Sequence, residues 1–245
     1  MTFLGHNATL TQPRVPVVGG PPLLLPCPAL PPFAPDDLAA VRHAFREAPA
    51  CRLRQAWRPQ AEADFAPGVV WTGWRADRLL VLAELTDADI VSLADAASER
   101  LWEQGDTFEI FLQAAGRPAY VELHIAPNHR RLQLRYNESV TVDAVRRSGS
   151  LAAARQDVTF DATVWAEPAA QRWFVHAAIP APLVTDRPGA LAGTCWRFSF
   201  GRYDYTRGRS EPVISSTSPH AAPDFHRCHE WGTLQFHDTS TAPSQ

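Results

Sequence analysis

The sequence predicts an all-β fold, an antiparallel β-sandwich of jelly-roll type with a short N-terminal helix and a Pro-rich leader. The first observation is a set of about ten short segments in which apolar and polar residues alternate, the period of a half-buried strand. The second is their spacing, since turn residues join neighbouring segments as hairpins. The third is the shortage of helical periodicity. Short strands with hairpin spacing and little helix are typical of a two-sheet sandwich.

The N-terminal region contains the leader and the one expected helix. Residues 1–35 carry nine prolines and follow no period, so we expect an extended leader. Asp36 can cap a helix that extends to about Glu47. The apolar side of this helix consists of Leu38, Val41 and Phe45.

The predicted strands follow as hairpin-like pairs in a single domain. In chain order they cover residues 51–57, 69–75, 79–85, 106–113, 120–126, 131–136, 158–166, 172–180, 195–203 and 231–236. Neither an internal repeat nor an interior linker interrupts this series. We therefore expect one domain over residues 36–237, followed by a loose tail at 238–245.

Composition excludes several classes of function. All 23 positive charges are arginine and the chain has no lysine, which excludes Schiff-base chemistry and phosphate loops that depend on lysine. The formal charge of −3 gives no basic field for nucleic acid. No apolar run reaches the roughly 20 residues of a membrane helix. These features predict neither a nucleic-acid partner nor a membrane partner.

The start of the chain and its cysteines bear on the cellular compartment. Residues 1–18 lack the basic and apolar regions of a signal peptide, so we expect a cytoplasmic protein with reduced thiols. Four cysteines allow three complete pairings, and their wide spacing does not choose among them. They are Cys27, Cys51, Cys195 and Cys228.

The stretch from Trp102 to Leu112 is the richest in chemistry. A loop with Trp102 leads into a strand whose one face is apolar and whose other face carries Glu109. A buried, unpaired carboxylate is costly, so Glu109 needs water or a hydrogen-bonding partner. An aromatic ring beside fixed polar groups suits sugar recognition, because CH faces stack on the ring while hydroxyls form hydrogen bonds. A core strand with a Trp closing one end of the sandwich is the structural alternative.

Four motifs occur in an order that resembles the carbohydrate-binding module family 9 fold. They are WEQGDTFEIF from Trp102, YVELHIAPN from Tyr120, WRFSFGRYDY from Trp196 and FHRCHEWGTLQF from Phe225. The likeness covers roughly residues 50–237. It implies a β-sandwich that binds a sugar between two aromatic rings, with polar side chains fixing its hydroxyl groups.

The resemblance also implies roles for individual residues. Trp102 matches the first ring, Phe225 falls where the second ring is expected, and Glu109 matches an acidic contact. His124 stands where sugar-binding members have an Arg, and Arg202 is a further candidate for hydrogen bonds to the sugar.

Other positions depart from the family pattern. Phe225 replaces a Trp, Ala126 replaces an Asn and Thr217 replaces another aromatic residue. A Phe stacks less area than a Trp, and each lost hydrogen bond is worth about 1 kcal/mol. The departures therefore motivate the alternative in which this sandwich has lost sugar binding.

Catalysis is a competing interpretation. Four acidic residues could supply the carboxyl pair of a glycosidase, which requires a separation of about 5–9.5 Å, but strand spacing predicts no such pair. They are Glu103, Asp106, Glu109 and Glu122. A serine nucleophile has little support, because the chain contains no Gly-x-Ser-x-Gly motif.

Metal binding is a second competing interpretation. A group of zinc-ligand residue types lies near the C-terminus but lacks the second close pair of a structural zinc site. It comprises His220, His226, Cys228, His229 and His237. Asp87, Asp89 and Asp95 could supply oxygen ligands to calcium, with solvated loop charges as the alternative. The sequence therefore predicts no cofactor, with calcium as a possibility that it leaves open.

The sequence thus predicts a non-catalytic carbohydrate-binding module, with a mono- or oligosaccharide as its partner. The predicted ligand-binding residues are Trp102, Glu109, His124, Arg202 and Phe225. A sandwich of the same kind that has lost sugar binding and contacts a protein partner is the alternative hypothesis. Hydrolytic activity is the third.

Overall fold

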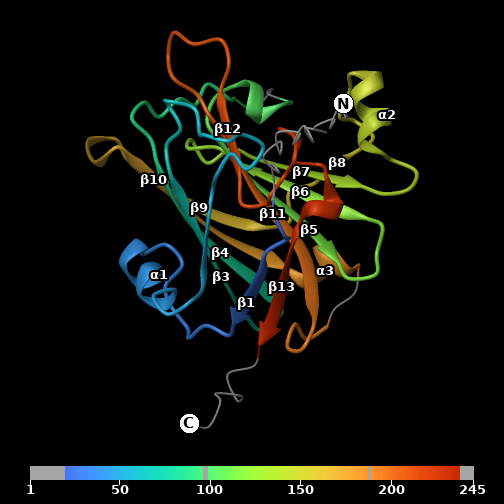
Figure 1. The fold of residues 1–245 in the computed structure, drawn as a ribbon. Coiled ribbons are helices and arrows are strands. Elements are labelled where there is room, and N and C mark those ends of the chain that lie inside the picture. Colours follow the sequence, from blue (N-terminus) through green and yellow to red (C-terminus); the bar gives the residue numbers. More distant parts are fainter. Residues whose placement is uncertain (1–19, 96–98, 187–188, 238–245) are drawn as a thin grey trace, which may run out of the picture.

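Two β-sheets pack face to face in the computed structural model, which describes residues 20–95, 99–186 and 189–237 (Figure 1). The larger sheet has the strand order β1-β13-β11-β5-β6-β7-β8, and β12 pairs with β11 beside this row. These strands are β1 (Leu24–Pro28), β5 (Thr107–Ala114), β6 (Tyr120–Ile125), β7 (Arg131–Tyr136), β8 (Arg155–Gln156), β11 (Cys195–Asp204), β12 (Val213–Ser216) and β13 (Gly232–His237).

The smaller sheet has the order β2-β3-β4-β10-β9. Its strands are β2 (Ala50–Arg52), β3 (Gly68–Arg75), β4 (Arg78–Thr86), β9 (Asp161–Glu167) and β10 (Arg172–Pro180). Within the described residues, neighbouring strands run antiparallel except β1 and β13, which are parallel. The predicted all-β sandwich, antiparallel in nearly all its pairs, is confirmed.

Strand alternation builds the core between the sheets. On β5, Phe108, Ile110 and Leu112 are fully buried among apolar residues of both sheets. The opposite face of β5 carries Glu109 and Phe111, which lie on the outer side of the larger sheet. A second apolar cluster covers that outer side, so Glu109 is buried away from the main core.

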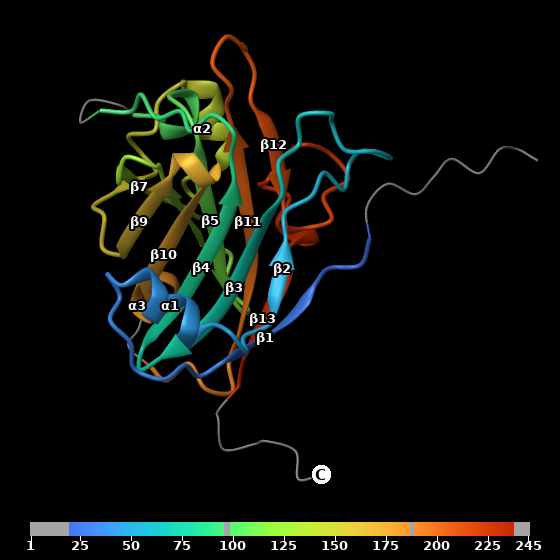
Figure 2. The ribbon, with the colours of Figure 1, turned by 90° about the vertical axis from the view of Figure 1, so that its left-hand side faces the viewer.

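In the described ranges, three helices lie outside the sheets: α1 (Leu38–Ala44), α2 (Val142–Ser148) and α3 (Ala181–Thr185). Short 3-10 turns are η1 (Leu101–Glu103), η2 (Pro168–Ala170) and η3 (Cys228–Glu230). Figure 2 shows α1 against the smaller sheet, and Figure 1 shows α2 on the opposite side of the sandwich. The helix α1 is capped by the Asp37 side chain rather than the expected Asp36, and it ends at Ala44 rather than Glu47.

Several elements differ from the sequence expectations, among them the strands β8 and β12 of the larger sheet, which were not predicted. Part of the expected leader forms β1, in which Leu25 and Cys27 are buried. Prolines are tolerated there because β1 is an edge strand, whose outward N–H groups need no partner. Between the predicted strands at 131–136 and 158–166 lies the helix α2, which was not predicted and is capped by the Thr141 side chain. The expectations for residues 1–19 and for the tail 238–245 fall outside the described residues.

The sequence led us to expect reduced thiols and no membrane-spanning helix. All four cysteines, which lie within the described ranges, are free, and burial raises the pKa of Cys27 and of Cys51 to about 12. None of the helices in the described part of the chain has the length and apolar character needed to span a membrane.

Candidate functional site

A cavity of about 260 Å³ opens on the outer side of the larger sheet, beneath α2 and the loops that cover this face. Acidic, basic and aromatic side chains line it together, a combination of polar and aromatic groups that binding pockets typically have. Its lining includes Arg100, Trp102, Glu109, Glu122, Tyr136, Val142, Arg146, Tyr203, Asp224, Phe225 and His226. The cavity is therefore the candidate functional site.

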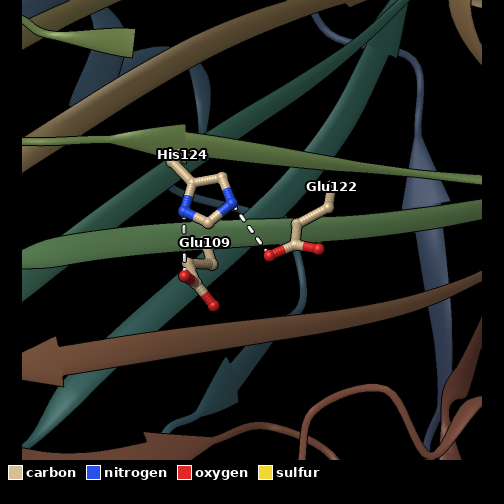
Figure 3. Close-up of side chains that lie close together, drawn as sticks. All are labelled: Glu109, Glu122 and His124. Carbon is tan, nitrogen blue, oxygen red and sulfur yellow. Dashed lines mark ion pairs between the residues drawn. The ribbon is translucent and has the colours of Figure 1, made fainter. Parts of the chain in front are cut away.

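Two glutamates and a histidine form a buried ion-pair trio at this cavity. His124 lies between the carboxylates, with its Nδ1 2.9 Å from Glu109 Oε1 and its Nε2 2.8 Å from Glu122 Oε1 (Figure 3). Adjacent strands position them, because Glu109 on β5 is the direct cross-strand neighbour of His124 on β6. Glu122 lies two residues before His124 and therefore on the same face of β6.

Burial and charge together determine the protonation of this trio. Burial alone would lower the pKa of His124, but Glu109 and Glu122 outweigh it and raise that pKa to about 10. Burial raises the pKa of Glu109. For Glu122, burial also favours the neutral form, yet His226, His124 and Tyr136 together hold its pKa below the usual value. At neutral pH the trio therefore contains an imidazolium flanked by at least one carboxylate.

Trp102 lies directly against the trio. The turn η1 presents its ring, which stacks on His124 with the ring centroids 4.9 Å apart. The Arg100 guanidinium lies 5.9 Å from the Trp102 ring centroid, and the Tyr205 hydroxyl donates to the Trp102 backbone carbonyl at 2.7 Å. These contacts fix a half-buried aromatic ring at the edge of a charged cavity.

Phe225 lines the cavity from a different direction. Its ring lies against Gly201 on β11, where an added Cβ would come within 2.8 Å of the ring. Trp231 Nε1 donates to the Phe225 backbone carbonyl at 2.8 Å and anchors this loop. The absence of a side chain at Gly201 thus lets Phe225 lie on the sheet next to Glu109, the cross-strand partner of Gly201.

The helix α2 forms another wall of the cavity. Val142 and Val145 line it, together with Arg146, whose Nη2 lies 3.0 Å from Asp224 Oδ1. Gly149 ends the helix in the left-handed region at φ +68°, a conformation that favours glycine. The Arg146–Asp224 pair joins α2 to the loop that carries Phe225.

The structure brings together most of the predicted site residues. Trp102, Glu109 and Phe225 line the same cavity, and His124 lies behind it, clamped between Glu109 and Glu122. Two other positions noted in the sequence do not line it. Ala126 is buried just beyond β6, and the Thr217 hydroxyl accepts a hydrogen bond from Phe200 N.

Arg202 is the exception among the predicted site residues. It is fully buried on the core side of β11, where its Nη2 lies 3.1 Å from both Asp87 Oδ2 and Asp204 Oδ1. Its Nη1 donates to the Thr86 carbonyl at 2.7 Å. Arg202 therefore links the two sheets, and its position does not support the predicted contact with a sugar.

The predicted ligand-binding set lacked several residues of the cavity, among them Glu122, which the sequence offered only as a possible catalytic carboxylate. Glu122 shares the face of His124 by strand alternation, so the pattern contained the signal for it. No local signal placed Tyr136, Tyr203 or His226 there, because these residues come from separate segments that meet only in the fold. The Tyr120 hydroxyl and His226 Nδ1 lie 2.9 Å apart, so this histidine is also held in place.

The predicted metal ligands have other partners. Asp87 accepts from Trp173 Nε1 and from Arg202, while Asp89 pairs with Arg207, so calcium at this loop stays a prediction. Among the described residues, donor atoms close enough to share a metal ion occur in two other groups. These are Glu109, Glu122 and His124, and Asp87, Asp106 and Asp204. In the first group carboxylates already engage both imidazole nitrogens, and in the second the Arg202 guanidinium supplies the positive charge.

A serine, a histidine and a glutamate also come together below Phe225. Ser199 Oγ lies 3.5 Å from His220 Nε2, and His220 Nδ1 lies 3.2 Å from Glu230 Oε2. Ser199 and His220 are fully buried and do not line the cavity. Ser199 Oγ is instead 3.0 Å from Ser216 Oγ, so the group acts as a buried polar network that fixes the loop over β11.

The two sheets form a β-sandwich, and the candidate cavity lies on the outer side of the larger sheet. No protein-family model matches the sequence, and no curated protein matches it. Solved structures do match. A candidate carbohydrate-binding protein from Bacteroides uniformis ATCC 8492 is 16% identical with a TM-score of 0.66, over 87% of this chain and 98% of its own.

A carbohydrate-binding module of family 9 from Caldicellulosiruptor kristjanssonii matches in two structures. Its complex with cellotriose is 14% identical with a TM-score of 0.59, over 91% of this chain and 100% of its own. Its complex with glucose is 13% identical with a TM-score of 0.58, over 91% of this chain and 99% of its own. The chain therefore has a fold like that of family 9 modules, as its sequence motifs predicted.

Proposed function

We propose that this chain is a non-catalytic carbohydrate-binding protein whose cavity on the larger sheet takes a mono- or oligosaccharide. The observation that carries the proposal is the position of the Trp102 ring beside the Glu109–His124–Glu122 trio at one cavity. A sugar offers CH faces to the ring and hydroxyl donors to the carboxylates. Phe225 adds a second apolar surface to the same cavity.

The comparisons suggest which sugars to test first. The family 9 module of the same fold is described in complex with glucose and with cellotriose. Stacking on an aromatic ring contributes roughly 1 kcal/mol beyond area burial, so we expect micromolar to millimolar dissociation constants.

The ion pairing of the glutamates favours binding over hydrolysis. A glycosidase uses one carboxyl group as an acid and the other as a base or nucleophile. Here a single imidazole lies between Glu109 and Glu122 and engages an oxygen of each. We propose that the trio serves as a fixed set of hydrogen-bonding groups rather than as a proton-transfer pair.

A variant whose enlarged side chain fills the cavity tests the proposal. Val142 is a half-buried, uncharged residue of α2 that lines the cavity and is not part of the ion-pair trio. In Val142→Trp, the larger side chain occupies the space that the sugar would take. We expect calorimetric titration of the wild type with glucose, cellobiose and cellotriose to give saturable binding, and the variant to lose at least tenfold in affinity.

Two results would contradict the proposal. Equal affinity in the wild type and in Val142→Trp, with both proteins folded by a cooperative melt, would place the sugar elsewhere. Absence of binding across neutral sugars at millimolar concentration would favour the alternative, a sandwich that has lost sugar binding and contacts a protein.

A further inference from the structure

A second cavity, of about 570 Å³, lies on the opposite side of the sandwich from the first. The segment before α1, the turn between β3 and β4, and strands β9 and β10 enclose it. Figure 2 faces this side of the molecule, where α1 covers part of the smaller sheet. Its volume falls in the range of sites for small organic molecules.

A buried histidine in this cavity has an unused nitrogen. His176 on β10 is 3% exposed, and one ring nitrogen bonds the backbone of Pro35. The other, Nε2, is buried without a hydrogen-bond partner among the described residues. Burial, with a smaller contribution from Arg75, lowers the pKa of His176 to about 4, so the ring is neutral at pH 7. Because the bonded nitrogen donates to a carbonyl, Nε2 is an acceptor that lacks a donor.

The charge around this cavity favours an anion. Arg75, Arg78 and Arg131 line it together with Asp77 and Asp161, an excess of one positive charge. Arg78 Nη1 lies 2.6 Å from Asp161 Oδ2, and Arg131 donates to a backbone carbonyl and lies over the Phe160 ring. Arg75 is exposed, and no carboxylate pairs with it within the described ranges. Its guanidinium lies 5.6 Å from the centroid of the Phe33 ring, which also lines the cavity.

We propose that this second cavity binds a sugar acid of the uronic-acid class. The carboxylate of the sugar acid would pair with Arg75, and one of its hydroxyl groups would donate a hydrogen bond to His176 Nε2. A monocarboxylate matches the excess of one positive charge better than a doubly charged phosphate does. The ring of Phe33 supplies an apolar surface for the CH face of the sugar. This site is separate from the neutral-sugar cavity proposed above.

Calorimetric titration with glucuronate and galacturonate, set against glucose and galactose, tests the proposal. We expect the acids to bind the second cavity, and Arg75→Met to weaken that binding at least tenfold. The matched control is Arg52→Met, which removes an exposed arginine of β2 on the same sheet outside the cavity. Trp102→Ala, which alters only the first cavity, should leave the affinity for the acids unchanged.

A second variant tests the histidine. In His176→Phe the ring shape is kept and the acceptor is lost, so we expect the affinity for glucuronate to fall about fivefold to tenfold in a protein that still melts cooperatively. The proposal is overturned if neither acid binds at millimolar concentration, or if Arg75→Met and Arg52→Met bind the acids equally. It is also overturned if Trp102→Ala abolishes their binding, since the acids would then occupy the first cavity.

Discussion

His124 shows how one residue controls both the charge and the shape of the candidate site. Its imidazole joins two buried carboxylates and supports the ring of Trp102. Removing one partner from a buried, paired set of charges typically costs about 3–5 kcal/mol, because the remaining charges lose their compensation. We therefore expect His124→Gln to be strongly destabilised near neutral pH.

The raised pKa of His124 predicts how stability depends on pH. The pKa rises from 6.5 to about 10 on folding, so its stabilisation is complete below about pH 6.5 and is lost as the pH approaches 10. We expect the free energy of unfolding of the wild type to fall between pH 8 and 10, by at most about 1.4 kcal/mol per pH unit. Denaturant titrations at a series of pH values measure this free energy of unfolding.

The control for this prediction is His124→Gln, whose stability should change less over the same interval. Asp106 also contributes, because burial raises its pKa from 3.8 to about 8. Its share of the free energy of unfolding is lost between about pH 4 and 8, and this loss occurs in both proteins. A wild-type stability that stays constant from pH 8 to 10 would contradict the assignment of an imidazolium to His124.

Arg202 shows how a predicted site residue can lie away from the cavity although the sequence contained a signal for its position. On β11 the even-numbered residues Trp196, Phe198 and Phe200 point into the core, and Arg202 continues that series. Strand alternation therefore excluded it from the outer side, where Gly201 meets Phe225. What alternation cannot supply is its pairing with Asp87, which lies 115 positions earlier in the sequence.

At the scale of elements, the packing of β11 against the Phe225 loop shapes the site. In Gly201→Ala the new methyl group would come within 2.8 and 2.9 Å of two Phe225 ring carbons. The ring must move, so we expect a loss of about 1–3 kcal/mol in the free energy of unfolding and weaker sugar binding. Thermal melts and calorimetric titration with glucose or cellotriose measure the two effects.

Gly189→Ala is the matched control, since Gly189 is exposed and has no atom within 4 Å of an added Cβ. Its stability should stay within about 0.5 kcal/mol of the wild type. If Gly201→Ala behaved like this control in both measurements, the contact between Gly201 and Phe225 would have no part in the site.

Elements with a clear local pattern could be predicted, and those defined by distant partners could not. The alternation of Val121, Leu123 and Ile125 identifies β6 without knowledge of its neighbours. The strand β1 contains Pro26 and Pro28, which disfavour a strand locally, and it forms because it pairs with β13 at the far end of the chain. The helix α2 is one of several short elements that tertiary packing stabilises, so its few apolar residues gave only a weak signal.

For the whole molecule, sheet architecture could be predicted because it follows from many weak local signals that agree. The site depends on which segments the fold brings together. Trp102 and Phe225 are separated by more than a hundred residues yet line one cavity, and only the resemblance to family 9 modules connected them in advance. Tyr136 and Arg146 also line the cavity, but the resemblance assigns them no role, so their place in the site could not be predicted.

The central claim is that the cavity beside Trp102 is the sugar site, and a fluorescence titration of Trp102→Ala tests it most directly. The matched control is Trp165→Ala, which removes a half-buried Trp from the smaller sheet outside both cavities. We predict a saturable fluorescence change with glucose or cellotriose in the wild type and in Trp165→Ala, and none in Trp102→Ala. Saturable binding of equal affinity in Trp102→Ala, in a protein that melts cooperatively, would contradict the account.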